Sequence, residues 1–371
     1  MGTIKQNRAN NILTSGKLDA TDGLNNDIPA SNIANASFSN VTAYPPSAGA
    51  AVTKVASDPP SPSDGQVWFN STSNVLKQYS LVAGSWATGN NMNNARHALG
   101  SAGTQTAALA FGGAEPSPIN STATEEYDGT SWAASGGLGT GRRGLAGCGI
   151  QTAALAFGGY ITGFQSATEE YNGSTWSPGN PLINARTSSA SAGTQTAGLA
   201  WGGDEPNPPG PNSNKTEEYD GTSWAAGGTL LSGVAYQGGA GIQTAALSFG
   251  GYAVPAAIST TEEYDGTSWT AGNNMNTARE APGEAGTQTA GLAFGGFTGP
   301  GPGINLTATE LYDGTSWTSN PTGLNTARQS LAGAGTQASA LAFGGYVTGQ
   351  LAATEEWTGA GAAVTKTITV S

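Results

Sequence analysis

Residues Gly103–Trp132 read GTQTAALAFGGAEPSPINSTATEEYDGTSW, and this stretch returns with small changes through most of the chain. Its opening Gly-x-Gln serves as a ruler, with glycines at Gly103, Gly149, Gly193, Gly241, Gly286 and Gly335. Successive copies are 46, 44, 48, 45 and 49 residues apart. A period of about 40–50 residues is typical of a propeller or another repeat array, so one unit largely decides the fold.

The first half of a unit predicts two strands. In Ala107–Phe111 the side chains facing one way are large and those facing the other way are alanine. Such a strand suits a sheet that is packed between neighbours on both sides. The run stops at Gly112 and Gly113, where positive φ costs little and the chain can leave the sheet. A further strand of small residues, Leu99–Gly103, precedes it.

The second half predicts a hairpin. Thr124–Tyr127 reads as a strand and ends in Asp128-Gly129, which is a strong two-residue hairpin signal. Thr130–Trp132 then begins the return strand. Each unit therefore predicts four short antiparallel strands. We expect the tryptophan of each return strand to occupy an equivalent, buried structural site, at Trp86, Trp132, Trp176, Trp224, Trp269 and Trp317.

The repeat resembles the kelch repeat. The resemblance rests on an arginine, a strand of small residues, an apolar strand closing on Gly-Gly, then Glu-x-Tyr-Asp and a nearby Trp. It covers about Gln66 to the C terminus and recurs six times. It implies an all-β, kelch-like β-propeller in which each unit is one four-stranded blade. The chain departs from the family pattern by placing Glu-Glu where kelch strands usually carry apolar residues, and by its Ala- and Gly-rich core.

The ends of the repeat region bear on the number of blades. Gln66–Trp86 reads as three strands without an innermost one, and Val364–Val370 alternates as an extra strand. Joining the two predicts seven blades, six complete and one shared between the termini. Six blades is the rival count, with Val364–Val370 as the outer strand of the last repeat.

Residues 1–64 differ in composition from the propeller, which we expect over residues 65–371. They are rich in Asn, Ser, Ala and Asp, with an apolar row of Ile28, Ile33 and Phe38. A segment with so few apolar residues cannot bury enough surface to fold alone. One interpretation is a flexible linker. The other is an attachment or oligomerisation segment that orders on a larger assembly, for example as a homotrimer through the apolar row.

Composition excludes several classes of protein. The chain has 371 residues, 57 of them glycine, and a net charge of -12. For an acidic chain we expect no nucleic-acid partner, because phosphates need clustered Lys and Arg. Cys148 is the single cysteine, so it forms no intramolecular disulfide and no Cys-based zinc site, and we expect it to be buried. No apolar run is long enough to span a membrane, and the N terminus lacks the apolar core of a signal peptide.

Repeated polar residues are expected to serve the blades. The Glu pairs, such as Glu125-Glu126, cannot act as a catalytic pair, because adjacent strand residues face opposite ways. We expect the arginines ahead of the inner strands to pair with these glutamates or with loop carbonyls; they are Arg96, Arg143, Arg186, Arg279 and Arg328. His97 is the only histidine, and kelch-like copper oxidases need several. We therefore expect a protein that is not an enzyme, with no catalytic residues, metal site or cofactor.

The variable stretch after each Gly-Gly is the candidate binding region. In a propeller these six loops emerge on one face, and a rigid scaffold with divergent loops is how recognition surfaces are built. The alternative is neutral drift in exposed turns. Their aromatic and acidic residues suit carbohydrate binding, and the candidates are Glu115, Tyr160, Phe164, Asp204, Glu205, Tyr252, Phe297 and Tyr346.

The overall design resembles tail-fibre and other appendage proteins of bacterial viruses. These often join a polar assembly segment to a hairpin like Asp64–Asn70 (DGQVWFN) and a distal binding domain. The resemblance implies a virion surface protein that binds a host-surface glycan or protein, and that contacts other virion proteins through residues 1–64. The alternative is a secreted or cell-surface bacterial adhesin or scaffold that uses the same face.

Overall fold

The computed structural model describes residues 53–59, 66–117, 119–206, 212–299, 303–359 and 361–367. Every regular element in this part of the chain is a strand, and it contains no helix. The chain separates into two compact units. One unit is Gly84–Gly359, and the other combines Met1–Ala83 with Ala360–Ser371.

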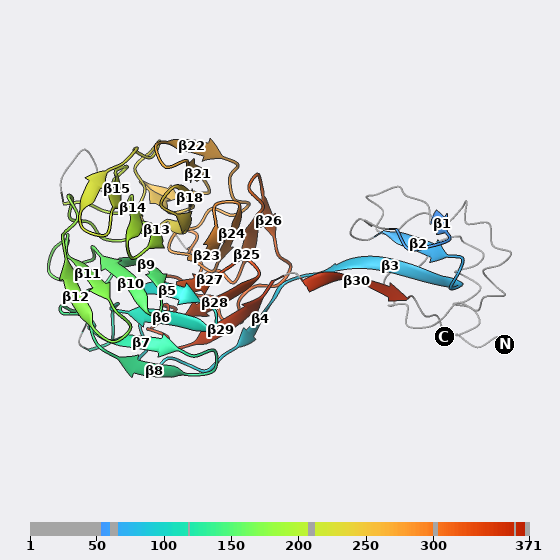
Figure 1. Cartoon of the computed structure of the whole chain (residues 1–371), viewed down its shortest axis with the longest axis horizontal. Helices are drawn as coiled ribbons and strands as arrows, with labels where there is room; N and C mark the ends of the chain where they lie inside the picture. The colour runs from blue at the N-terminus through green and yellow to red at the C-terminus, as the bar shows by residue number, and fades with distance from the viewer. Residues whose placement is uncertain are drawn as a thin grey trace. The chain divides into compact units, whose positions relative to one another are not determined.

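The larger unit consists of six four-stranded antiparallel sheets, each built around one copy of the repeat. In Figure 1 they lie side by side around a common centre, in a propeller-like arrangement. The innermost strands are β5 (Gly100–Thr104), β9 (Ala146–Ile150), β13 (Ala190–Thr194), β17 (Gly238–Ile242), β23 (Gly283–Thr287) and β27 (Ala332–Gly335). The second strands are β6 (Ala107–Phe111), β10 (Ala153–Phe157), β14 (Ala197–Trp201), β18 (Ala245–Phe249), β24 (Ala290–Phe294) and β28 (Ser339–Phe343).

The outer half of each sheet is the hairpin expected from the sequence. The third strands are β7 (Thr124–Tyr127), β11 (Thr168–Tyr171), β15 (Thr216–Tyr219), β21 (Thr261–Tyr264), β25 (Thr309–Tyr312) and β29 (Thr354–Thr358). The outermost strands of the first five sheets are β8 (Trp132–Ser135), β12 (Trp176–Gly179), β16 (Trp224–Ala226), β22 (Trp269–Gly272) and β26 (Trp317–Ser319). A short extra hairpin, β19 (Tyr252–Ala253) and β20 (Ala256–Ala257), lies in the loop of the fourth sheet.

The sixth sheet takes its outermost strand from the other end of the repeat region. β4 (Ser85–Thr88) pairs with β29, with Trp86 opposite Trp357 and Ser85 opposite Thr358. The expectation that Trp86 shares one blade with the strands before it is wrong. The reason is that Trp86 is the return-strand tryptophan of the repeat, so it completes the sheet that lacks one.

The smaller unit has its own four-stranded sheet. Its strands, in spatial order, are β1 (Thr53–Val55), β2 (Val67–Asn70), β3 (Val75–Val82) and β30 (Gly361–Thr367). The C-terminal strand β30 therefore pairs with part of Gln66–Trp86, as expected, and does not pair with β29. This sheet, however, belongs to the smaller unit and not to the unit that holds the six repeats.

The side chain of Asp58 contacts both β2 and β3 of this smaller sheet. Its carboxylate accepts hydrogen bonds from the side chains of Trp68, Asn70 and Lys77, at 3.0, 2.7 and 2.6 Å. These contacts, led by the one from Lys77, lower the pKa of Asp58 to about 2. Most of residues 1–64, including Ile28, Ile33 and Phe38, lie outside the described residues, so their proposed attachment role stays a prediction.

The tryptophans link neighbouring sheets of the larger unit. Each indole N–H donates to the threonine hydroxyl that begins the third strand of the preceding sheet, at 2.9–3.0 Å. Trp86 bonds Thr309 and Trp132 bonds Thr354, so the series continues across the join between the last and the first sheet. All six are buried, apart from a partly exposed Trp176.

The glutamine of the Gly-x-Gln ruler makes a second link. Its amide group donates to two backbone carbonyls of the preceding sheet, one on the second strand and one on the third. Gln105 does the same across the join, to Ala340 and Trp357, at 2.9 and 2.7 Å. The residue that sets the repeat period is therefore a connector between sheets.

The two glutamates of each pair have separate structural roles. The second one accepts a hydrogen bond from the tyrosine of the following sheet, as Glu126 does from Tyr171 at 2.5 Å. The first one pairs with the buried arginine of its own sheet, as Glu125 does with Arg96 at 2.8 Å. Four of these arginines also donate to loop carbonyls.

One expected arginine partner is wrong by one residue. Arg142, and not Arg143, pairs with Glu169, at 2.6 Å. Counting back from the ruler would have found it, because every paired arginine lies seven residues before its glycine, as Arg142 does from Gly149. In the fourth sheet that position is Val234, and among the described residues its Glu262 pairs with no arginine.

Candidate functional site

Six residues form a closed backbone ring at the beginning of the innermost strands. Each backbone N–H donates to the carbonyl of the corresponding residue in the preceding sheet, at 2.7–2.9 Å. All six have positive φ, between 48 and 61°. We call this ring the belt; it consists of Ala98, Gly144, Ser188, Tyr236, Ala281 and Ser330.

The six variable loops begin directly outside the belt. The first loop residue of each sheet forms an antiparallel bridge with the residue just before the belt, and these pairs are His97–Ala114, Arg143–Tyr160, Thr187–Asp204, Ala235–Tyr252, Glu280–Phe297 and Gln329–Tyr346. Gly112, with φ of +62°, lets the chain leave the strand there, and a side chain would place its Cβ 2.9 Å from the Arg142 carbonyl. All six loops therefore start on the same face, which we call the loop face.

The predicted aromatic residues surround the belt and are partly exposed. Tyr160, Tyr252, Phe297 and Tyr346 are each the first residue of their loop. Phe164 folds back on Tyr160, with ring centroids 5.7 Å apart and the planes nearly perpendicular. The structure therefore brings these aromatic side chains onto one face, around one axis.

The predicted acidic residues divide into two groups. Asp204 begins its loop in the same position as the aromatic residues, and burial raises its pKa. Glu205 accepts hydrogen bonds from Ser213 at 2.6 Å and from Lys215 at 2.7 Å. Glu115 accepts one from the Ser121 hydroxyl. Glu115 and Glu205 are thus engaged within their own loops.

Sequence reasoning missed an inner set of residues on this face. His97 lies against Tyr346, with ring centroids 5.2 Å apart, and the Arg143 guanidinium lies 4.9 Å from the centre of the Tyr160 ring. On another part of the belt Tyr236 is 40% exposed. These residues lie one or two positions after the place of the repeated arginine, which Val234 occupies in the fourth sheet. Their variation from copy to copy was the available signal.

Charges of opposite sign lie on different sheets of the loop face. Arg143 belongs to the second sheet, whereas Asp204 and Glu280 belong to the third and fifth. Burial, followed by the nearby Arg143, lowers the pKa of His97, so its imidazole is neutral at pH 7. Burial also raises the pKa of Glu280. The face is therefore polar, aromatic and electrostatically uneven.

Three further findings bear on function. No group of three or more His, Cys, Asp or Glu side chains could hold a metal ion within the described residues. Over the same part of the chain, no helix is long and apolar enough to cross a membrane. Burial raises the pKa of the Cys148 thiol to about 12, as expected for an unreactive core cysteine.

Neither the protein-family models nor the curated proteins with which the chain was compared give a match.

Proposed function

We propose that the protein is a non-enzymatic binding protein whose loop face contacts a glycan or an exposed protein surface. The observation that carries this proposal is a contrast between two sets of positions. The Trp, Gln, Tyr and Glu residues that join the sheets repeat, whereas the residues at the belt and at the loop starts differ from sheet to sheet. A constant frame that presents divergent, half-exposed aromatics is suited to recognition.

The scaffold we propose is a six-bladed, kelch-like propeller. The Trp–Thr and Gln–carbonyl links support this count, because each series runs once around six sheets and includes the join between the last and the first sheet. The belt supports it in the same way. On this proposal β4 closes the ring, and the sheet of the smaller unit is not a seventh blade.

A glycan is the ligand that the loop face suits best. Tyrosine and phenylalanine rings can stack on sugar rings, and Asp204, Glu280 and Arg143 can bond hydroxyl groups. Among the described loop residues the aromatics are only partly exposed and Tyr160 lies beside Arg143. The exposed apolar side chains of Ile119, Val254 and Ile304 belong to three different loops. This chemistry favours a hydroxyl-rich ligand over an apolar one.

Binding to a glycan array tests the proposal directly. We expect the full chain to bind a subset of bacterial surface glycans, and the variant Tyr160→Ala/Tyr346→Ala to lose this binding while keeping its melting temperature. The matched control is Ile150→Ala/Ile242→Ala, which changes two exposed side chains at the far ends of the innermost strands. If the control and the tyrosine variant bind equally, the loop face is not the binding surface.

For its biological setting, we propose a surface or appendage protein of a bacterial virus, attached to other virion proteins through residues 1–64. The alternative is a secreted or cell-surface bacterial adhesin. The resemblance in overall design supports the first. Finding the chain by mass spectrometry in purified virus particles would favour it, and finding the chain only in a bacterial envelope fraction would favour the second.

A further inference from the structure

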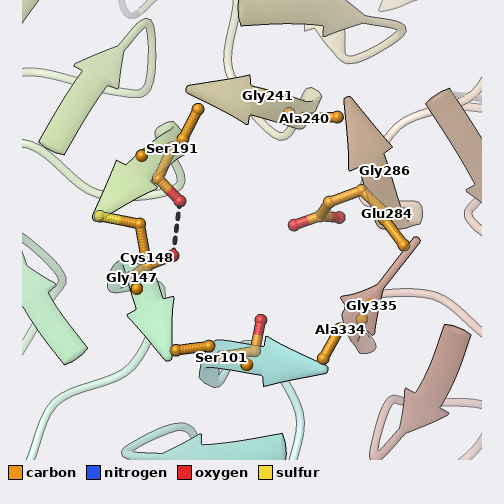
Figure 2. Close-up of a pocket in the computed structure, with 18 residues that line it drawn as sticks. Ser101, Gly147, Cys148, Ser191, Ala240, Gly241, Glu284, Gly286, Ala334 and Gly335 are labelled. Atoms are coloured by element: carbon orange, nitrogen blue, oxygen red, sulfur yellow. Dashed lines mark hydrogen bonds between the residues drawn. The ribbon is translucent and has the colours of Figure 1, made fainter. Parts of the chain in front are cut away.

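The six innermost strands enclose a narrow channel that the loop face does not explain. Each strand contributes three consecutive residues to its lining, and its volume is about 110 Å³. Figure 2 shows the strands around this space. Because a water molecule occupies about 30 Å³ in the liquid, the channel can hold a few waters or a hydrated ion.

The first of the three lining residues alternates, from strand to strand, between glycine and a residue with an oxygen-bearing side chain. In order around the ring these residues are Ser101, Gly147, Ser191, Gly239, Glu284 and Gly333. The glycines have no room for a side chain. A Cβ at Gly147 would lie 2.2 Å from the Phe111 ring, and a Cβ at Gly333 would lie 2.1 Å from the Glu284 carbonyl oxygen. Only every second strand can therefore present a side chain here, and all three that do so carry oxygen.

Glu284 has the single carboxyl side chain among these lining residues. Its carboxylate points into the channel in Figure 2 and has no hydrogen-bond or ion-pair partner among the residues that the structure describes. The residue is partly exposed and lines the channel, and burial of the carboxyl raises its pKa to about 8. An unpaired charge in such a place is costly, so the group must stay protonated or take a cation.

The two serines are suited to complete a cation site. The Ser191 hydroxyl donates its hydrogen to the Gly147 carbonyl, at 2.8 Å, so its lone pairs remain free to act as ligands. The hydroxyl of Ser101 also points into the channel in Figure 2. One carboxylate with hydroxyl oxygens and water is the ligand type that hard cations such as Ca²⁺ prefer.

We propose that the central channel binds one Ca²⁺ ion, with Glu284 as its charged ligand and Ser101, Ser191 and water as neutral ligands. The site joins the first, third and fifth sheets, so an ion there stabilises the ring. With a single charged ligand the affinity is weak, with a dissociation constant on the order of 10⁻⁴–10⁻³ M. This proposal stands apart from ligand binding at the loop face.

Calorimetric titration of the full chain with CaCl₂ at a pH above the raised pKa of Glu284, about 8, tests the site. We expect about one ion per chain, and a melting temperature about 2–4 °C higher once Ca²⁺ exceeds its dissociation constant tenfold. Protons compete with the ion for Glu284, so both effects should weaken at acidic pH.

Two variants remove the charged ligand. Glu284→Gln keeps the size of the side chain, and Glu284→Ser introduces the residue that the first and third sheets carry at this position. Each should weaken Ca²⁺ binding by more than about tenfold. If Glu284→Gln does not fold, Ca²⁺ binding by Glu284→Ser tests the role of the carboxylate.

Glu262→Gln is the matched control, because Glu262 is also a buried carboxylate without an arginine partner but does not line the channel. It should bind Ca²⁺ as the wild type does. The proposal is overturned if the wild type shows no Ca²⁺ binding or stabilisation, or if the Glu284 variants bind as tightly as the control.

Discussion

Glu262 shows what the repeated arginine does, because its sheet has Val234 in the arginine position. The Leu231 N–H donates to its carboxylate at 2.9 Å, but burial outweighs this contact and raises the pKa of Glu262 above 4.5. The folded state therefore holds this proton more tightly than the unfolded chain does. At pH values between the ordinary and the raised pKa, unfolding releases this proton. The contribution of Glu262 to stability therefore falls as the pH rises through that interval.

We therefore predict that Glu262→Gln is more stable than the wild type at pH values above the raised pKa. The advantage should shrink towards about pH 4, where the unfolded carboxyl is itself largely protonated. Urea unfolding of both proteins across this pH range measures the difference. An advantage that stays constant with pH would mean that the charge of Glu262 is not what destabilises the sheet.

A matched pair of departures from the repeat lies between the fifth and sixth sheets. Elsewhere a tyrosine hydroxyl bonds the second glutamate of the preceding sheet, as Tyr219 bonds Glu170 at 2.5 Å. Here the glutamate position holds Leu311 and the tyrosine position holds Trp357, whose indole N–H bonds the Gln337 carbonyl instead. The polar donor and its acceptor are therefore absent together, and apolar packing replaces them.

This pairing predicts strong coupling between Leu311 and Trp357. Leu311→Glu alone should destabilise the protein, because it sets a carboxylate against a buried indole. Adding Trp357→Tyr supplies the hydroxyl partner and should recover about 1–3 kcal/mol of the loss. A double-mutant cycle by chemical denaturation measures this, and purely additive effects would contradict the proposed exchange of contacts.

At the scale of elements, the period and the local signals predicted most of the fold. The Gly-x-Gln ruler, the Gly-Gly stop and the Asp-Gly turn predicted the four strands of each sheet, because these signals act within a few residues. The partner of β4 could not be predicted in this way. Its strand signal directly follows that of β3, while the residues it pairs with are near the other end of the chain.

The candidate site was predictable to a similar extent. The loops were found because their sequences differ, and the shared scaffold places them on one face. The inner positions were missed because each repeat contributes only one or two residues there, and because Arg143 was assigned the pairing role that Arg142 has. Whether a carboxylate such as Glu205 is free or bonded within its loop depends on contacts from Ser213 and Lys215 that the sequence does not display.

The glutamine connectors give a prediction at the scale of elements. Gln195→Ala removes two hydrogen bonds to the carbonyls of Ala154 and Tyr171, and should cost about 1–3 kcal/mol. Gln105→Ala removes the equivalent bonds across the join between the first and last sheets. If the ring is closed, the two substitutions should have similar effects on the free energy of unfolding. A near-zero effect for Gln105→Ala alone would indicate an open join.

For the whole molecule, the decisive contact is the pairing of β4 with β29, since it joins residues 273 positions apart, Ser85 and Thr358. Paired residues of antiparallel strands have Cα atoms about 4.5–5.5 Å apart, which is within the range of a disulfide. Both side chains are exposed, so cysteines at these positions would not disturb the core. Cys148 is buried and should not compete for pairing.

We predict that Ser85→Cys/Thr358→Cys forms an intramolecular disulfide under mild oxidation. Because the bond closes a very long loop in the unfolded chain, it should stabilise the folded unit by up to about 5 kcal/mol. Thermal unfolding of the oxidised and reduced forms of the same variant measures this gain, and the reduced form is the control. If β4 instead stays with β3 in solution, the two cysteines are too far apart to join, and the disulfide will not form within one chain.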